Sequence, residues 1–560
     1  MSRSAKAFIR ITMTGILFLL LVSGCASAAG GKTIMAGCPS VCGEKVAARE
    51  GKGGLVLSVP GFWDLSKITL EEEGSPILFL GTDQTGIAPG QETDLTGLKG
   101  EKIRIRDEKR QLGTLTVLQG SKIPALFLEV DAKELKKVNY SKENEITEGR
   151  AVYLESDGTT AYDGGLKQLK GRGNNSFLYA KKPYQVKLSE KALLSGMGES
   201  KTWVLLANYV DESLLRNQIM LDLSREIGLK YAVSCIQTDV WINGEYNGLY
   251  LLTEKIQIGD ERVDITNLEK ETEKVNDTPF EPGKIVTEKS AAYPILRSYP
   301  DINDPDDITG GYIMTVEKPA RLKNYVLAGF KTKNELNIRI KEPTCPSRAQ
   351  AEYLFDRVSR LQRAVMAENG TDPETGEHYQ SLLDERSFAQ KFLIEEWCKN
   401  YDFFGGSQYM YKDSDPADPL IYAGPAWDYD LCFGNMKDRG YSAAGKYLTS
   451  YRRNSNLFWL LYQHESFRNK VREIWQLVFR PAVSAILGET KADPDGILCP
   501  LDEYQERIRD SAEMNTRRWG ISNAATAGGG GFDRAVRYMK QWMTERTAWM
   551  DGEYLMVTGE

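Results

Sequence analysis

The chain has 560 residues, of which 41% are hydrophobic and 27% charged, enough for roughly two to four soluble domains with substantial cores. Its formal net charge of −7 argues against a nucleic-acid partner, because phosphate binding needs clustered Lys and Arg. The only two histidines, His378 and His464, lack the partners and spacing of a Ser-His-Asp hydrolase or a histidine zinc site.

The first residues predict an export signal. The cationic segment MSRSAKAFIR precedes the apolar run ITMTGILFLLLV, which is short for a transmembrane span. The run ends in LVSGC, which resembles a bacterial lipobox. We therefore predict that residues 1–24 are a lipoprotein signal peptide and that a lipid on Cys25 anchors the protein to the extracytoplasmic face of the cell membrane. Simple secretion after a cut near ASA is the alternative.

Residues 25–52 are small and polar, and we expect them to form a tether. From residue 53 to about 120, short apolar runs such as GLVLSV and PILFLG alternate with turn signals, which predicts a small all-β, sandwich-like domain. Cys38 and Cys42 indicate a disulfide or a surface loop rather than a metal site. Five further cysteines are predicted to be mostly small buried residues: Cys235, Cys345, Cys398, Cys432 and Cys499.

A strand-rich region begins near residue 121 and leads into the amphipathic segment DESLLRNQIMLDLSREIGL, a predicted helix with Asp211 as N-cap and Gly228 as stop. Asn243-Gly244 then predicts a two-residue hairpin turn. Residues 265–309 are charged and contain proline, which indicates a surface insertion. Helical periodicity dominates the chain after GGYIMTVEK. This order predicts an α+β fold.

The segment AWDYDLCFGN, residues 426–435, places two carboxylates in an otherwise apolar run. QYMYKD and LIYAG predict a hairpin around SDPAD, which would bring Asp402 close to Asp428. Crowded carboxylates repel each other unless a cation or proton lies between them. We therefore predict that Asp428 binds a divalent metal. On a straight strand Asp430 points to the opposite face, unless the chain bends there, and it caps or orients the neighbouring loop. A pair of turn-forming aspartates is the alternative.

Two further stretches are candidates for anion binding. In KGRGNNS, the glycines allow close backbone approach and Arg172 supplies a bidentate donor, although ordinary turns use the same residues. In the predicted strand KKPYQVKL, alternation separates Tyr184, Val186 and Leu188 from Lys187. Lys187 would contact phosphate with Glu254 orienting it if its face lines a cleft, and would otherwise be a solvated lysine.

The ordered blocks LKGRGNNSF, KKPYQVKLS, WVLLANYVDESLLRN, NGEYNGLYLLTEKI and NYD…YMYKD…AWDYDLCFG resemble the CotH-type kinases, named for spore coat protein H. The resemblance runs from about residue 122 to 550. It implies an atypical protein-kinase-like, two-lobed domain over residues 121–553, which uses ATP and Mg (or Mn) to phosphorylate serines of secreted or surface proteins. On this basis Asp402 is the catalytic residue, Asp428 binds metal, and Arg172, Lys187 and Glu254 serve the nucleotide phosphates.

One position departs from the kinase pattern D-x-x-x-x-N, because Ser407, followed by Gln408, replaces the asparagine that holds a second metal. A hydroxyl or an amide can still coordinate, so Ser407 and Gln408 are predicted metal ligands. The alternatives are a nucleotide-binding pseudokinase, a surface-binding scaffold without catalysis, and a glycosidase with Asp402 and Asp428 as its carboxyl pair. A glycosidase does not need Arg172, Lys187 or the GRG turn.

Overall fold

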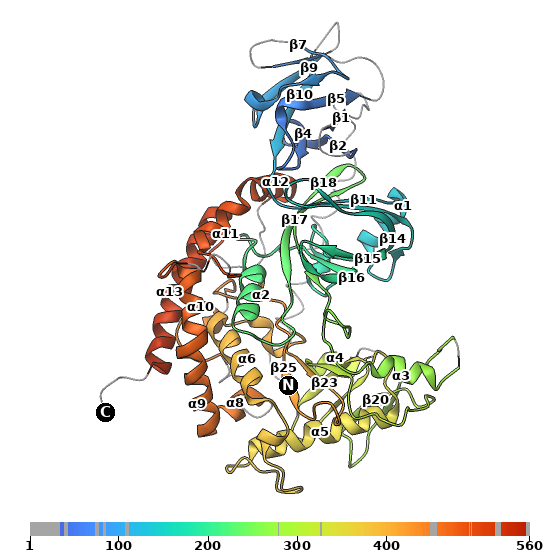
Figure 1. Ribbon diagram of the computed structural model, residues 1–560, viewed down its shortest axis with the longest axis vertical. Helices are drawn as coiled ribbons and strands as arrows, with labels where there is room; N and C mark the ends of the chain where they lie inside the picture. The colour runs from blue at the N-terminus through green and yellow to red at the C-terminus, as the bar shows by residue number, and fades with distance from the viewer. Residues whose placement is uncertain are drawn as a thin grey trace, which may run out of the picture. The chain divides into compact units, whose positions relative to one another are not determined.

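The computed structural model describes residues 34–38, 43–72, 78–81, 86–106, 111–277, 279–324, 327–437, 439–448, 456–491, 493, 496–520 and 528–555. The predicted signal peptide, the lipid on Cys25 and the residue Cys42 lie outside this part of the chain. The chain divides into two compact units (Figure 1). The first extends to Gln119 and includes Gly244–Tyr246, and the second comprises Gly120–Asn243 and the chain from Asn247 onward.

The described elements of the first unit are short strands and two 3-10 turns, Leu65–Lys67 and Thr96–Leu98. One sheet has the order β3-β4-β10-β9-β6-β7, and β1, β2, β5 and β8 follow the order β2-β1-β5-β8. The strands are β1 Ile34–Gly37, β2 Lys45–Ala47, β3 Arg49–Gly51, β4 Gly54–Val59, β5 Ile68–Glu72, β6 Leu78–Leu80, β7 Gly86–Ile87, β8 Glu92–Thr93, β9 Lys102–Arg106 and β10 Gln111–Gln119.

The strands β1, β2 and β3 lie in the stretch that the sequence predicts to be a tether. The described residues between 34 and 51 are therefore part of the first unit, in which Ile34, Ala36 and Val46 are almost completely buried. The difference arises because these strands are only three or four residues long. Such short strands show too little alternation to be recognised in a glycine-rich sequence.

The second unit begins with strands that close on themselves. The sheet order is β16-β15-β14-β13-β11-β17-β18, and β16 also pairs with β18, which completes a ring (Figure 1). Tyr184, Val186 and Leu188 of β15 are buried in its interior cluster, on the shared face that alternation predicts. The elements are β11 Ala125–Glu129, α1 Ala132–Tyr140, β12 Glu145–Ile146, β13 Gly149–Leu154, β14 Thr160–Gly171, β15 Tyr184–Leu194, β16 Met197–Leu206, β17 Cys235–Ile242 and β18 Glu245–Glu254.

Helix α2, Arg216–Glu226, is the predicted amphipathic helix, but it begins later than expected. Asp211 is not its N-cap, because the helix begins at Arg216 and Leu215 occupies the cap position. The Asp211 carboxylate nevertheless accepts hydrogen bonds from the backbone N–H groups of Ser213 and Arg216. Gly228 follows the helix with a φ of 73°, as a glycine stop requires. The predicted hairpin turn is also confirmed, since Asn243 and Gly244 both have positive φ between β17 and β18.

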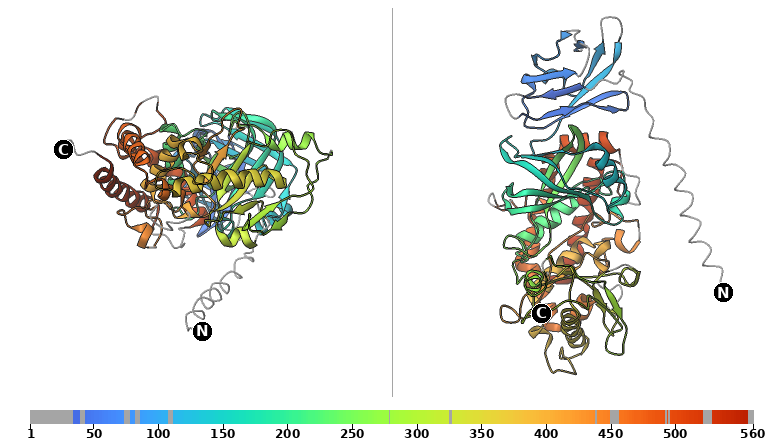
Figure 2. Two further views of the ribbon diagram at one scale, coloured as in Figure 1. Left: turned by 90° about the horizontal axis from the view of Figure 1, so that it is seen from below. Right: turned by 90° about the vertical axis from the view of Figure 1, so that its right-hand side faces the viewer.

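A second sheet has the order β19-β20-β22-β23-β21-β24-β25, and helix α5 packs against it (Figure 2). The predicted surface insertion is partly wrong, because its strands β19 and β20 belong to this sheet and Leu268 and Leu296 are buried in the core. The elements are α3 Leu268–Lys274, β19 Val286–Glu288, β20 Ile295–Ser298, β21 Tyr312–Val316, α4 Pro319–Asn324, β22 Gly329–Lys331, β23 Asn337–Glu342, α5 Arg348–Met366, β24 Tyr409–Lys412 and β25 Ile421–Ala423.

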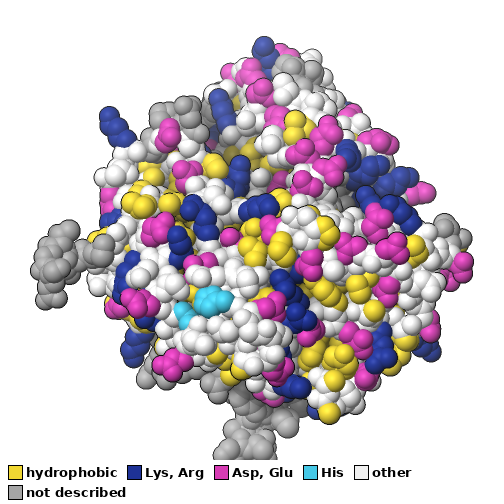
Figure 3. Space-filling view, turned by 60° about the horizontal axis from the view of Figure 1, so that its bottom comes forward, with side chains coloured by type: hydrophobic (Ala, Val, Ile, Leu, Met, Phe, Trp, Pro, Cys, Tyr) yellow, Lys and Arg dark blue, Asp and Glu magenta, His cyan; other side chains and the backbone are white. Residues whose placement is uncertain are grey.

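The rest of the second unit is mainly helical, so the chain combines helices and sheets as an α+β fold does. The helices are α6 Glu385–Cys398, α7 Arg439–Ser442, α8 Leu457–Leu461, α9 Glu465–Ile474, α10 Arg480–Leu487, α11 Leu501–Arg507, α12 Arg509–Trp519 and α13 Phe532–Tyr554. Within the described residues, no helix is both long enough and apolar enough to cross a bilayer. Acidic and basic side chains are interspersed over the face in Figure 3.

Candidate active site

Helix α6 supplies the first carboxylate of the site. The helix ends where Lys399 adopts a φ of 46°, a left-handed conformation that stops helical hydrogen bonding. A single 3-10 turn, Tyr401–Phe404, follows, and the side chain of Asn400 caps it by accepting from the N–H of Asp402 at 3.1 Å. Asp402 is therefore fixed on a short turn, with 24% of its side chain exposed.

The predicted hairpin of β24 and β25 supplies the second carboxylate. Met410 pairs with Ala423 in antiparallel register, as the sequence predicts. The chain bends at Asp428 instead of forming a straight strand, because β25 ends at Ala423 and Asp428 has a φ of 72°. Non-glycine residues seldom adopt this conformation, which bends the chain between Asp428 and Asp430. The alternation that was expected to separate these two side chains is therefore absent.

Two hydrogen bonds join the segments that carry Asp402 and Asp428. The side-chain amide of Asn400 donates to the backbone oxygen of Asp428 at 3.1 Å, and the Ser407 hydroxyl donates to Asp428 Oδ2 at 3.0 Å. The structure thus brings Ser407 directly to Asp428. Gln408 is buried beside it, and its Nε2 has no hydrogen-bond partner among the described residues.

The three aspartates of the site interact unfavourably. Burial and the charge of Asp428 raise the pKa of Asp402 from 3.8 to about 6. Burial also raises the pKa of Asp428, against the opposing effects of the Ser407 hydrogen bond and the Arg172 charge. The pKa of Asp430 lies well above its usual range because of burial and the charges of Asp428 and Asp402. Such a group favours a bound cation or proton.

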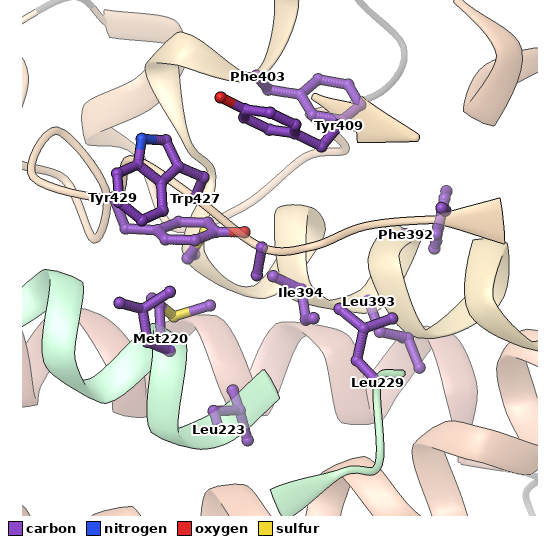
Figure 4. Packing of buried hydrophobic residues seen from close by; sticks show 14 of the residues in the cluster. Met220, Leu223, Leu229, Phe392, Leu393, Ile394, Phe403, Tyr409, Trp427 and Tyr429 are labelled. Carbon is purple, nitrogen blue, oxygen red and sulfur yellow. The ribbon is translucent and has the colours of Figure 1, made fainter. Parts of the chain in front are cut away.

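Tyr429, between the two aspartates, anchors their segment to helices α6 and α2. Lys391 donates to Tyr429 Oη at 2.9 Å, and this hydroxyl donates to Glu395 Oε1 at 2.9 Å. The backbone N–H of Tyr429 donates to Asn217 Oδ1 on α2 at 2.7 Å. Figure 4 shows Trp427 and Tyr429 between α2 on one side and the Phe403 and Tyr409 rings on the other. The site rests on a packed, hydrogen-bonded base.

Arg172, predicted to bind phosphate, reaches the same place from the end of β14. Its guanidinium lies 5.1 Å over the ring of Trp427. Burial lowers the pKa of Arg172, while Tyr409 and the charge of Asp428 oppose that shift. Its Nη1 is buried and has no hydrogen-bond partner in the described part of the chain. A guanidinium N–H left in this state is suited to an anionic oxygen.

Lys255 and Lys341 lie near enough to Arg172 to feel its charge, and Arg339 lies near Lys341, while Glu342 partly offsets both lysines. Sequence reasoning missed Lys255, Arg339 and Lys341. Burial, with Arg339 and Arg172 adding charge repulsion, lowers the pKa of Lys341 from 10.5 to about 7. Burial also lowers the pKa of Lys255, to which Arg172 contributes a small repulsion. We call Arg172, Lys255, Arg339 and Lys341 the cationic cluster. The available signal was NIRIKE, in which Arg339 and Lys341 alternate with buried isoleucines.

Lys318 was also missed, although it lies beside Asp402. Its Nζ is 3.9 Å from Asp402 Oδ1, and 47% of its side chain is exposed. The Lys318 chain crosses Gly405, where a Cβ would lie 2.1 Å from Lys318 Cε. Gly405 thus gives the lysine its path over the turn of Asp402. The pairing of Thr315 in β21 with Tyr409 in β24 brings Lys318, three residues after Thr315, close to the turn that carries Asp402.

The assignments of Lys187 and Glu254 are not supported by the structure. Lys187 is exposed and pairs with Thr202, whereas Glu254 pairs with Trp203. Thr202 and Trp203 are adjacent, so their partners point to opposite faces of the sheet. Glu254 instead forms an ion pair with Arg262 at 2.8 Å. The prediction that Glu254 orients Lys187 is therefore wrong.

The donors at Asp428 suit a hard cation only in part. Among the described residues, no group of three or more His, Cys, Asp or Glu side chains forms a complete metal site. Mg²⁺ commonly takes one or two carboxylates, phosphate oxygens and water instead of an all-protein cage. Asp428 and the Ser407 hydroxyl fit a site of that kind.

Comparison with protein families gives one match. Residues 169–550, more than half of the chain, match the family described as CotH kinase protein. The chain belongs to the CotH kinase family. No curated protein matches it. Every residue of the candidate site lies within the span that matches the CotH family, and membership in that family indicates a kinase-like function.

Proposed function

We propose that this CotH family member is an atypical protein kinase that transfers the γ-phosphoryl group of ATP to serines of exported proteins. The observation that carries the proposal is the repelling pair Asp402 and Asp428 beside the cationic cluster. Carboxylates that need a cation, next to cations that need an anion, are complementary to a metal nucleotide. The ring of strands and the helices of the second unit would then correspond to the two lobes of a kinase.

Asp402 would accept or orient the proton of the substrate hydroxyl. With a pKa of about 6 it is ionised at neutral pH, and it is a stronger base than an ordinary aspartate. Lys318, half exposed at 3.9 Å, can contact both this carboxylate and the phosphoryl oxygens that accumulate charge during transfer. The two side chains would thus act on opposite partners of the same reaction.

Asp428, Ser407 and Gln408 would hold Mg²⁺ or Mn²⁺. The bound ion neutralises the charge that develops on bridging phosphate oxygens. The Nη1 of Arg172, which lacks a partner, would donate to a phosphate oxygen, and Lys255 and Lys341 would add charge behind it. Asp430 lies near both aspartates, and a cation bound there would favour its ionised form.

A nucleotide-binding pseudokinase is the second candidate, and one contact favours it. Ser407 takes the place of a second metal-binding asparagine, and its hydroxyl already donates to Asp428. Loss of the second metal would leave nucleotide binding intact and slow the transfer step. A glycosidase agrees less well with the site, because glycoside cleavage does not use a cationic cluster.

We also propose that the chain acts at the extracytoplasmic face of the membrane, held by a lipid on Cys25, with secretion as the alternative. The support is the cationic and apolar start of the sequence and its LVSGC motif. The substrates would then be secreted or surface proteins that present a serine.

The test incubates the purified chain with γ-labelled ATP and Mg²⁺ or Mn²⁺, and measures transfer of the labelled phosphoryl group to a serine-containing protein or to the chain itself. We expect Asp402→Ala and Asp428→Ala to abolish labelling while retaining a wild-type circular dichroism spectrum. Asp502→Ala, in an exposed ion pair with Lys540, is the matched control and keeps activity. Labelling that survives both site substitutions would overturn the proposal, and nucleotide binding without transfer in the wild-type chain would identify the pseudokinase.

A further inference from the structure

Two cysteines lie side by side between the segments that form the candidate site. Cys398 is the last residue of α6, four residues before Asp402, and Cys432 lies two residues after Asp430. Both are completely buried. The backbone N–H of Phe433 donates to the oxygen of Cys398 at 2.8 Å. The Cys398 thiol donates to the oxygen of Glu395 at 3.9 Å, and the two thiols are close enough for each to affect the pKa of the other.

This geometry is that of a disulfide precursor. A backbone hydrogen bond joins the two segments at these residues, and a disulfide requires α-carbons about 4.4–6.8 Å apart. The two thiols are also near enough to influence each other, so little movement is needed to bring them together. We propose that Cys398 and Cys432 are a modification site, at which a disulfide forms when the chain folds in an oxidising compartment.

The oxidant would be a disulfide, either of a thiol–disulfide oxidoreductase or of a small thiol compound. The thiolate of one cysteine attacks the disulfide, forms a mixed disulfide and releases one thiol. The thiolate of the other cysteine attacks the mixed disulfide and releases the second thiol. The two cysteines thereby lose two protons and two electrons, and the oxidant is reduced from one disulfide to two thiols.

Burial fixes when this reaction takes place. Burial raises the pKa of the thiols of Cys398 and Cys432, and only the thiolate reacts. Exchange is therefore fast before the core around α6 has packed and slow afterwards. The finished bond is protected from reductants by the same packing.

The bond would close the chain between residues 398 and 432, which contains Asp402, Ser407, Gln408 and both later aspartates. It would oppose their electrostatic repulsion by preventing the two segments from separating. The proposal does not depend on phosphotransfer, because its readouts are a covalent bond and thermal stability. Cys235 provides a contrast, since its thiol faces the carboxyl of Asp222 at 3.7 Å and not a second thiol.

The experiment refolds the full chain in a mixture of oxidised and reduced glutathione, denatures it with N-ethylmaleimide present, and maps its peptides by mass spectrometry without reduction. We expect one linked species that contains Cys398 and Cys432, 2 Da lighter than the two unlinked peptides. The Tm of the chain refolded with a reductant should be several degrees lower than the Tm of the oxidised chain. Cys432→Ser should show no such difference, whereas Cys235→Ser, the matched control, should retain it.

Unlinked, fully alkylated Cys398 and Cys432 in the folded wild-type chain would overturn the proposal. So would a link from either residue to a different cysteine. If Cys432→Ser does not fold, the peptide map of the wild-type chain decides the question alone.

Discussion

Buried charges within helix α6 are paired with opposite charges, whereas the carboxylates in the loops that follow it repel one another. Inside the core, Lys391 is paired with Glu395, and Glu396 is paired with Arg546 at 2.9 Å, with all four side chains almost completely buried. In the loops, Asp402 has Lys318 at 3.9 Å and the weaker influence of Arg321, while Asp428 and Asp430 repel it. The contrast separates charges that hold the fold from charges that await a ligand.

The paired charges also connect the two regions. Arg546 donates to the backbone oxygens of Ala444 and Lys446, and Glu396 accepts from the N–H of Leu448 at 2.8 Å. Lys399, at the end of α6, donates to Ala443 and Gly445. Hydrogen bonds from Lys399, Glu396 and Arg546 therefore hold the segment from 443 to 448 at the C-terminal end of α6. The buried ion pairs that stabilise α6 thus also fix the position of residues 443–448.

The largest expected effect on stability comes from breaking the buried ion pair between Glu396 and Arg546. Glu396→Gln leaves Arg546 buried without its counter-charge, so we expect the free energy of unfolding to fall by about 3–5 kcal/mol. Urea denaturation measures this. Asp502→Asn removes an exposed pair at 2.7 Å and is expected to cost less than about 1 kcal/mol. Equal losses in the two variants would contradict the distinction.

Asp402→Asn tests the unpaired side. We expect phosphotransfer to fall by about 10²–10⁴-fold, because the base is lost while the shape is kept. The same variant should be more stable than the wild-type chain at pH 7 without nucleotide, since one repelling carboxylate is removed. Kinetics and urea denaturation of one preparation measure both. A destabilised variant would place Asp402 among the structural charges.

Stability should fall with rising pH around the pKa of Asp402, because a buried, repelled carboxyl group is more stable in its protonated form. The pKa of Asp402 is about 6 in the folded chain and 3.8 as the unperturbed value, so the folded state binds more protons between these pH values. Its contribution to stability is complete below pH 3.8 and is lost as pH rises through about 6, on the order of 2–3 kcal/mol. Subtracting the pH profile of Asp402→Asn from that of the wild-type chain isolates it. A wild-type chain that gains stability relative to Asp402→Asn as pH rises would contradict the assignment.

The cationic cluster should show the smallest effects. Nucleotide phosphates would raise the pKa of Lys341 above about 7, so we expect proton uptake on binding and weaker binding as pH rises through 7. Calorimetry in buffers of different ionisation enthalpy measures the uptake. Arg172→Met should weaken binding about tenfold. Lys187→Met, on an exposed part of β15, is the matched control and should change nothing.

The sequence correctly predicts turns and hairpins, because these are determined by residues that are adjacent in the chain. The hairpin of β24 and β25 follows from two short alternating runs around SDPAD, and Asp402 and Asp428 lie close together as it predicts. Gly228 and the Asn243-Gly244 turn are equally local, because each depends on a backbone conformation that few residues adopt. The bend at Asp428 was not predictable, since an aspartate gives little sign of a positive φ.

Contacts between distant segments could not be predicted. Lys318 reaches Asp402 only through the pairing of β21 with β24, whose register is set by burial across the whole sheet. Alternation correctly separated Tyr184, Val186 and Leu188 from Lys187. It could not show that the carboxylate chosen as a partner, Glu254, lies on the other face of a closed ring.

The closure of that ring through β16 and β18 has a mechanical consequence. A sheet without a free edge cannot open by detaching a terminal strand, so its wall resists deformation. Arg172, which follows directly after β14 in this wall, is thus a fixed reference point. Movement that adapts the site to an incoming substrate is then left to groups such as Lys318, whose half-exposed side chain passes over Gly405.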